Sequence, residues 1–245
     1  KGSTLVQAID AIDPPRKLSE RPLRVAIQDV YKIASVGVMP VGRVEAGILR
    51  IGQHVRFAPG GAVATVIAPA TRAPGEAYPG DHVAFAVSGA ALRDLRRGQV
   101  CSEHVPDGQT VPACEVVAFT AHVVVFLDHT VTAVVPGYTP VCDAHTAHVP
   151  VRVDALVAKL DRRSGQVVED KPKQLRPGDA AVVRLVPTKP MCVEPYAEFP
   201  ALGRFALRDQ RHTVMVGVVK SVEKKLDDGR IVVWPPPRGS GAKKV

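Results

Sequence analysis

The sequence predicts an all-β protein made of two consecutive antiparallel β barrels. Glycine and proline are frequent, at 20 and 22 of 245 residues, so tight turns can separate many short segments. Many of these segments are rich in valine and alternate apolar with polar residues, which is the period of a strand with one buried face. Few segments are suited to form the crossover helices of a parallel sheet, which argues against an α/β fold.

The amino end predicts a short helix followed by a linker. Residues 4–10 read Thr-Leu-Val-Gln-Ala-Ile-Asp, enough for two helical turns. Pro14 and Pro15 end these turns, because proline disfavours a helical conformation before it and cannot donate a backbone hydrogen bond. We therefore assign residues 1–21 to a linker.

The first barrel is predicted over residues 22–110. Short alternating segments are separated there by glycine, proline or aspartate, as expected for strands joined by turns. The predicted strands are 23–30, 36–44, 54–57, 63–67 and 82–87, and the clearest turns are 59–61 and 78–81.

The second barrel is predicted over residues 111–228, after a Pro- and Gly-containing break at 105–112. Its predicted strands are 116–126, 139–152, 149–157 and 214–220. The first is rich in β-branched residues, residues 149–157 alternate in polarity, and 214–220 is apolar nearly throughout. Residues 229–245 predict a flexible, proline-rich tail. Within the tail, Val232, Val233 and Trp234 leave two alternatives, docking as an added strand or groove anchor, or disorder.

Charge and composition narrow the class of partner. The 32 basic and 24 acidic residues give a net charge of +8, which favours RNA or acidic protein surfaces. Aromatic residues are only 4%, which argues against a reader of stacked bases. No apolar run approaches the roughly 18 residues of a membrane span. The four widely separated cysteines are typical of reduced thiols in an intracellular protein.

Catalytic signatures are missing from the sequence. It contains no GxxxxGK[ST] phosphate loop, no GxSxG elbow and no HExxH zinc pair, so we expect neither catalytic residues nor a cofactor in this chain. Cys142, His145 and His148 have a spacing that metal sites use. A strand over 139–152 places the two histidines on opposite faces, so we expect no metal site.

Motifs in both halves resemble one family in matching order. In the first half these are DVYKI at 29–33, PVGRVE at 40–45 and YPGD at 78–81. In the second half they are HTAH at 145–148, DRRSG at 161–165, GDAA at 178–181, KPMCVE at 189–194 and LGRFA at 202–206. From about residue 2 to 225, the chain resembles the second and third domains of eukaryotic elongation factor 1-alpha, the counterpart of bacterial elongation factor Tu.

The resemblance implies a role in translation. Members of this family are GTPases that carry aminoacyl-tRNA to the ribosome in the cytoplasm. This chain corresponds to their tRNA- and ribosome-binding barrels, with tRNA or ribosomal RNA as partner, and with GTP bound only by a GTPase domain upstream. The alternative is a GTPase-free paralogue that is a structural subunit of a ribosomal or cytoskeletal assembly, with contacts to actin or tubulin.

The resemblance also suggests site residues. Candidates for RNA contact in the second barrel are Arg204, Arg208, Arg211, Lys220, His145 and Thr146, since accessible cations and hydroxyls bind phosphates. Arg204 and Arg208 have an alternative role, which is to hold turns by local hydrogen bonds.

The first barrel departs from the family where the family binds the aminoacyl end of tRNA. The altered positions are Ala34, Ser35, Val38, Ala68 and His82. The first two replace glycines, Ala68 replaces a glutamate that holds the terminal adenosine, and His82 replaces an asparagine near the aminoacyl group. We expect this pocket to be degenerate. In the second barrel, residues 128–131 replace the family's Asn-His-Pro-Gly turn, which we expect to remodel a hairpin end.

Overall fold

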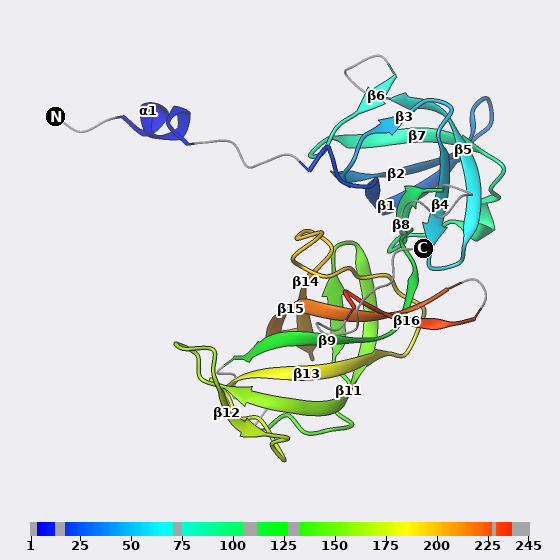
Figure 1. The fold of residues 1–245 in the computed structure, drawn as a ribbon. Helices are drawn as coiled ribbons and strands as arrows, with labels where there is room; N and C mark the ends of the chain where they lie inside the picture. Colours follow the sequence, from blue (N-terminus) through cyan, green and yellow to red (C-terminus); the bar gives the residue numbers. More distant parts are fainter. Residues whose placement is uncertain are drawn as a thin grey trace.

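A computed structural model describes residues 4–12, 18–70, 75–104, 112–126, 133–226 and 229–236. Strands dominate these residues and form two barrels that lie against each other (Figure 1). The predicted all-β class and the pair of barrels are confirmed. The break expected at 105–112 and the remodelled turn at 128–131 lie almost wholly outside the described residues.

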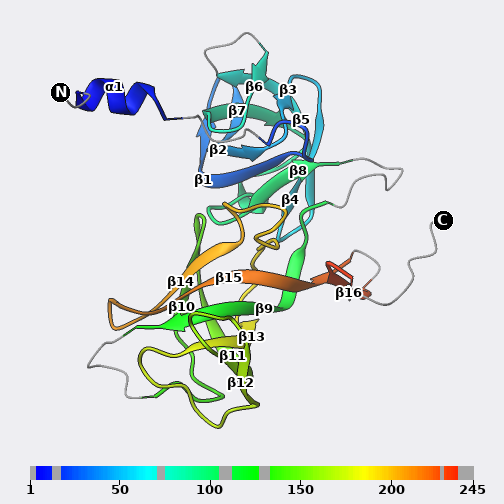
Figure 2. The ribbon, with the colours of Figure 1, turned by 60° about the vertical axis from the view of Figure 1, so that its left-hand side comes forward.

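The predicted amino-terminal helix is present as α1 (Leu5–Asp10). A capping box begins it, since the Thr4 hydroxyl accepts from the Gln7 backbone and the Gln7 side chain accepts from the Thr4 backbone. None of its six residues is buried, and both views show it apart from the barrels (Figures 1 and 2). The exposed apolar side chains of this helix and its end are Leu5, Val6, Ile9 and Ile12.

The first barrel is a closed antiparallel sheet in the order β1-β2-β7-β5-β4-β8. Its strands are β1 (Arg24–Ile33), β2 (Gly37–Ala46), β4 (His54–Ala58), β5 (Ala62–Ala70), β7 (His82–Ser88) and β8 (Val100–Glu103). A small pair, β3 (Leu49–Arg50) with β6 (Glu76–Ala77), and the 3-10 turn η1 (Leu92–Asp94) complete it. The alternation read from the sequence points Val25, Phe57 and Phe85 into the core.

The second barrel follows the order β10-β14-β15-β9-β13-β11, and pairing of β10 with β11 closes the ring. Its strands are β9 (Glu115–Val125), β10 (Val141–Ala144), β11 (Ala147–Leu160), β12 (Val167–Asp170), β13 (Ala180–Pro187), β14 (Arg204–Asp209), β15 (His212–Lys225) and β16 (Ile231–Trp234). The β12 strand extends the sheet beyond β11. Inside the ring, Phe119 and Phe205 meet edge to face with ring centroids 5.6 Å apart.

The carboxyl end continues the second sheet. The β16 strand pairs antiparallel with β15, and Trp234 packs against the core of the second barrel. Its indole N–H donates to the Glu198 carboxylate at 2.8 Å. Of the two alternatives, residues 231–234 therefore form an added strand, and the flexible tail expected from 229 does not include them. Apolar packing and backbone pairing outweigh the proline-rich composition that suggested a tail.

The single strand expected over 139–152 is wrong. The structure has a hairpin there, in which β10 ends at Ala144 and β11 begins at Ala147. His145 and Thr146 form the turn, and His145 adopts a positive φ of 43°. Because this turn uses neither glycine nor proline, the sequence carried no turn signal at the point where the chain reverses.

The two barrels meet through small apolar side chains. Residues from both sides form one buried cluster, which comprises Ala26, Ala46, Ala58, Val100, Ala113, Cys192, Phe199 and Leu202. Gly98 of the first barrel lets the backbone of the second barrel approach closely, since a Cβ placed on it would lie 3.2 Å from the Ala147 Cα. The short side chains let the two backbones approach closely.

A buried ion triad, made of Arg24, Glu194 and Lys224, lies within this contact. The Arg24 guanidinium of β1 donates to Glu194 at 3.2 Å and lies 4.5 Å from the centre of the Phe199 ring. The Lys224 ammonium of β15 lies 2.7 Å from the same carboxylate. The three side chains are between 0% and 3% exposed. One carboxylate of the second barrel is thus shared by a cation from each barrel.

The hairpin turn of the second barrel adds polar contacts beside the triad. The His145 Nε2 lies 2.9 Å from the Cys192 carbonyl oxygen, which can only accept, so a neutral ring carries its proton on Nε2. The Thr146 hydroxyl donates across the contact to the Ile27 carbonyl at 2.7 Å. Burial lowers the pKa of His145 to about 4. The hydrogen bond to Cys192 has the opposite and smaller effect.

The triad generates a stability prediction. Replacing Glu194 with glutamine leaves two buried cations without a counter-charge, which costs about 3–5 kcal/mol of unfolding free energy. The matched control is Glu76→Gln in the exposed Arg50–Glu76 pair, with an expected cost below about 1 kcal/mol. Urea denaturation of the three proteins measures both values. Equal costs for the two substitutions would contradict the role of the triad.

His145 generates a pH prediction. The folded chain keeps this ring neutral down to about pH 4, whereas the unfolded chain takes up a proton near pH 6.5. The unfolded state therefore binds more protons in this window, and stability falls as the pH is lowered from about 6.5 to 4. Burial also lowers the pKa of His122, so it contributes to the same loss.

The contribution of His145 is separated by substitution. His145→Gln is expected to flatten the pH dependence of the urea midpoint, because this variant no longer carries the ring whose pKa burial lowers. An unaltered pH dependence in the His145 variant would show that its ring does not stay neutral in the folded protein.

Candidate nucleic-acid interface

Basic side chains from both barrels line one cleft at their contact. Arg96 and Arg97 come from the loop between η1 and β8, and His148 and Lys189 come from the second barrel. All four side chains are exposed, and the cleft has a volume of about 310 Å³. We call these four residues and the space between them the seam cleft. Phosphate groups bind to convergent cations such as these two arginines and this lysine.

Local structure positions the cations of the seam cleft. Gly98 has a φ of 89°, a conformation that L side chains rarely adopt, and its N–H donates to the Ile27 carbonyl. This turn brings Arg97 against the hairpin of the second barrel, where its Nε donates to the Thr146 carbonyl at 3.3 Å. His148 is held by Asp143 at 2.5 Å. Each barrel therefore supplies half of the cleft.

Two of the predicted RNA contacts, His145 and Thr146, are half-buried at the edge of the contact between the barrels. The polar atoms of His145 and Thr146 bond to the Cys192 and Ile27 carbonyls. These hydrogen-bonding groups are therefore directed at protein.

The other four predicted RNA contacts fall into two groups. Arg204 lies over the Tyr196 ring and donates to its hydroxyl, and Lys220 follows on the neighbouring strand β15. Arg208 pairs with Asp143 at 3.2 Å, and Arg211 lies exposed in the β14–β15 turn. The hydrogen bond of Arg204 to Tyr196 fits the turn-holding alternative, whereas Arg208 pairs with a residue of the neighbouring strand β10. Both side chains remain exposed.

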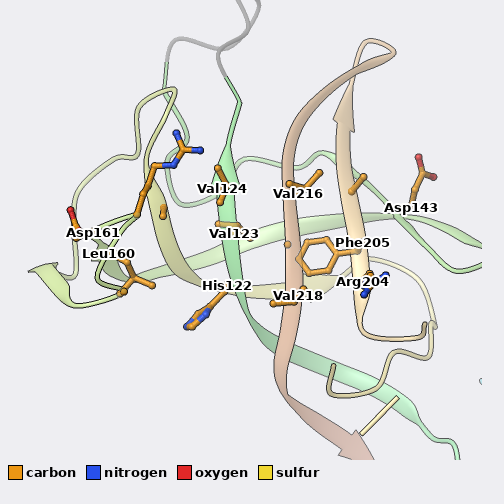
Figure 3. A pocket seen from close by; sticks show the side chains of 15 residues that line it. His122, Val123, Val124, Asp143, Leu160, Asp161, Arg204, Phe205, Val216 and Val218 are labelled. Carbon is orange, nitrogen blue, oxygen red and sulfur yellow. The ribbon is translucent and has the colours of Figure 1, made fainter. Parts of the chain in front are cut away.

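An apolar groove, which the sequence did not indicate, runs along the outer face of the second barrel (Figure 3). Its floor is formed by Val124 on β9, Ala206 on β14, and Val216 and Val218 on β15. Its volume is about 640 Å³. In Figure 3, His122 and Arg204 lie near one end of this floor. The apolar run 214–220 recognised in the sequence contributes Val216 and Val218, which lie half-buried on this outer face.

The structure does not gather the altered pocket residues into one cluster. Ala34 and Ser35 occupy the exposed β1–β2 turn, and Val38 packs against the core of the first barrel. Ala68 pairs with Ala86 on β7, whereas His82 lies four residues away along that strand, about 13 Å at the usual rise. Ala68 and His82 are exposed, so the changes are spread over the face of β5 and β7 and the adjoining turn.

The structure also places the cysteines and the potential metal-ligating side chains of the described residues. Cys101, Cys142 and Cys192 are buried, and burial raises the pKa of each thiol. No group of three or more His, Cys, Asp or Glu side chains among the described residues is placed to hold a metal ion. Helices long and apolar enough to cross a membrane are likewise not found among these residues.

Comparisons with known proteins agree with this architecture. The family description "GTP-eEF1A C-terminal domain-like" matches residues 118–220. Elongation factor 1-alpha of Blastobotrys adeninivorans is 50% identical over 91% of this chain and 48% of its own length, and that of Onchocerca volvulus is 46% identical over 99% and 52%. A crystal structure of sup35 complexed with GDP aligns over 90% of the chain and 52% of its own length, with a TM-score of 0.73 and 26% identity.

The chain spans about half the length of the curated relatives it matches. Identity of this level over nearly the whole chain establishes the relationship that the motifs indicated. This chain belongs to the elongation factor 1-alpha family.

Proposed function

We propose that these two barrels are the RNA-binding half of a cytoplasmic translation elongation factor, which binds tRNA at the seam cleft and acts with a GTPase domain. The observation that carries the proposal is the seam cleft itself, in which exposed cations of both barrels face one space. The names of the relatives support translation as the process. The chain itself, on this proposal, binds RNA and does not hydrolyse GTP.

Two apolar surfaces support docking of a GTPase domain. Leu5, Val6, Ile9 and Ile12 recur at helical spacing on one side of α1, where the described residues bury none of them. The apolar groove of the second barrel is a further exposed apolar surface. A domain that packs on both would remove this apolar area from water and hold α1 in place.

Phosphate binding in the seam cleft is tested by substitution. Arg96→Ala and Lys189→Ala are each expected to weaken binding of a tRNA transcript, and to reduce the slope of log affinity against log salt by about one. Arg163→Ala is the control, because this arginine lies in the turn between β11 and β12, outside the seam cleft. Fluorescence anisotropy at several salt concentrations measures affinity and slope. Equal salt slopes in all three variants would contradict RNA binding at this cleft.

The altered pocket residues generate a second binding prediction. We expect the chain to distinguish aminoacylated from uncharged tRNA poorly, because Ala68 offers no side-chain acceptor and His82 replaces an amide. The double variant Ala68→Glu, His82→Asn restores the family's residues. It is expected to raise the affinity for aminoacyl-tRNA about fivefold, which corresponds to the net free energy of one hydrogen bond. The affinity for uncharged tRNA is expected to stay unchanged. A wild-type chain that already strongly prefers aminoacyl-tRNA would refute the degenerate pocket.

A further inference from the structure

One short turn of the second barrel contacts Arg24 of the first barrel. Residues 194–199, which we call the clamp turn, present both the Glu194 carboxylate and the Phe199 ring to Arg24 of the first barrel. The Glu198 and Phe199 N–H groups both donate to the Pro195 carbonyl at 3.0 Å and close the turn. The position of the clamp turn therefore decides how well Arg24 is held.

The C-terminal strand contacts the clamp turn through Trp234. The Trp234 indole N–H lies 2.8 Å from both oxygens of Glu198, and its ring packs on the core of the second barrel. A hydrogen bond to a charged acceptor is stronger than one between neutral groups. Trp234 therefore ties the clamp turn to the barrel core.

The same strand also supports the other cation of the ion triad. Backbone pairing places Val232 opposite Lys224 and Trp234 opposite Val222 on β15. Lys224 reaches Glu194 from this part of β15. Without β16, this stretch of β15 loses one of its two hydrogen-bonded neighbours, since β9 pairs with its other edge.

We propose that β16 is a brace that sets how firmly the two barrels are joined, and that it thereby tunes phosphate binding in the seam cleft. Trp234 is a positioning residue in this scheme, because it acts on Arg24 through Glu198 and the clamp turn. The effect on phosphate binding rests on the proposed function, since the cations of the seam cleft come from both barrels and face one another only while the joint holds.

Hydrogen exchange of the full chain, followed by mass spectrometry, tests the brace. Trp234→Ala is expected to speed exchange in residues 192–203 about tenfold, which corresponds to losing one hydrogen bond to a charged group. Exchange in β13, away from the brace, is expected to stay unchanged, which shows that the second barrel remains folded. Ile231→Ala is the matched control, because this side chain lies on the same strand and is exposed.

Trp234→Phe separates packing from the hydrogen bond. Phenylalanine keeps an aromatic ring against the core and lacks the indole N–H, so exchange in residues 192–203 is expected to rise above that of the Ile231 control. Exchange at wild-type rates in both Trp234 variants would overturn the brace.

Anisotropy with a tRNA transcript then tests the link to the seam cleft. Weaker binding by Trp234→Ala, with the Ile231 control unchanged, supports it. Faster exchange with wild-type affinity overturns the link and leaves the brace standing. If Arg96→Ala and Lys189→Ala also bind as the wild type does, the failure lies in the proposed function, and the exchange result still decides the brace.

Discussion

The geometry of the molecule depends on one shared carboxylate. Glu194 is fully buried between Arg24 and Lys224, and a lone charge in such a place would carry a large desolvation cost. The three groups must therefore remain together, and they come from β1, the clamp turn and β15. Because Arg24 belongs to the first barrel and the other two to the second, the charge requirement fixes the barrels relative to each other.

The regular part of the fold was readable from the sequence. Segments of period two with Gly, Pro or Asp between them predicted β1, β2, β4, β5 and β7, because side-chain alternation and turn chemistry are local properties. The strands β3, β6, β8, β12, β13 and β14 were not predicted, and β10 lay within the single strand expected over 139–152. The first four have two to four residues, which are too few for alternation to be recognised.

The candidate site could be predicted only in part, for a different reason. Residue type showed that Arg204, Arg208 and His145 can hydrogen-bond phosphate, but could not show whether their polar groups already face protein. Conversely, Arg97 and Lys189 lie far apart in sequence and belong to different barrels. Only the joint between the barrels brings them to one cleft, so the positive surface is a tertiary property that composition records only as a net charge of +8.

The distribution of contacts explains how such a chain can diverge without losing its fold. The altered residues Ala34, Ser35, Ala68 and His82 are exposed, so their substitution changes surface chemistry and leaves the barrel core intact. Gly98, Gly203 and Gly217 have no such freedom, because a Cβ there would meet backbone or ring atoms at 3.2 Å or less. Binding properties are thus free to change on the face of the first barrel, whereas the backbones that meet at the joint are constrained by close packing and by the buried charges.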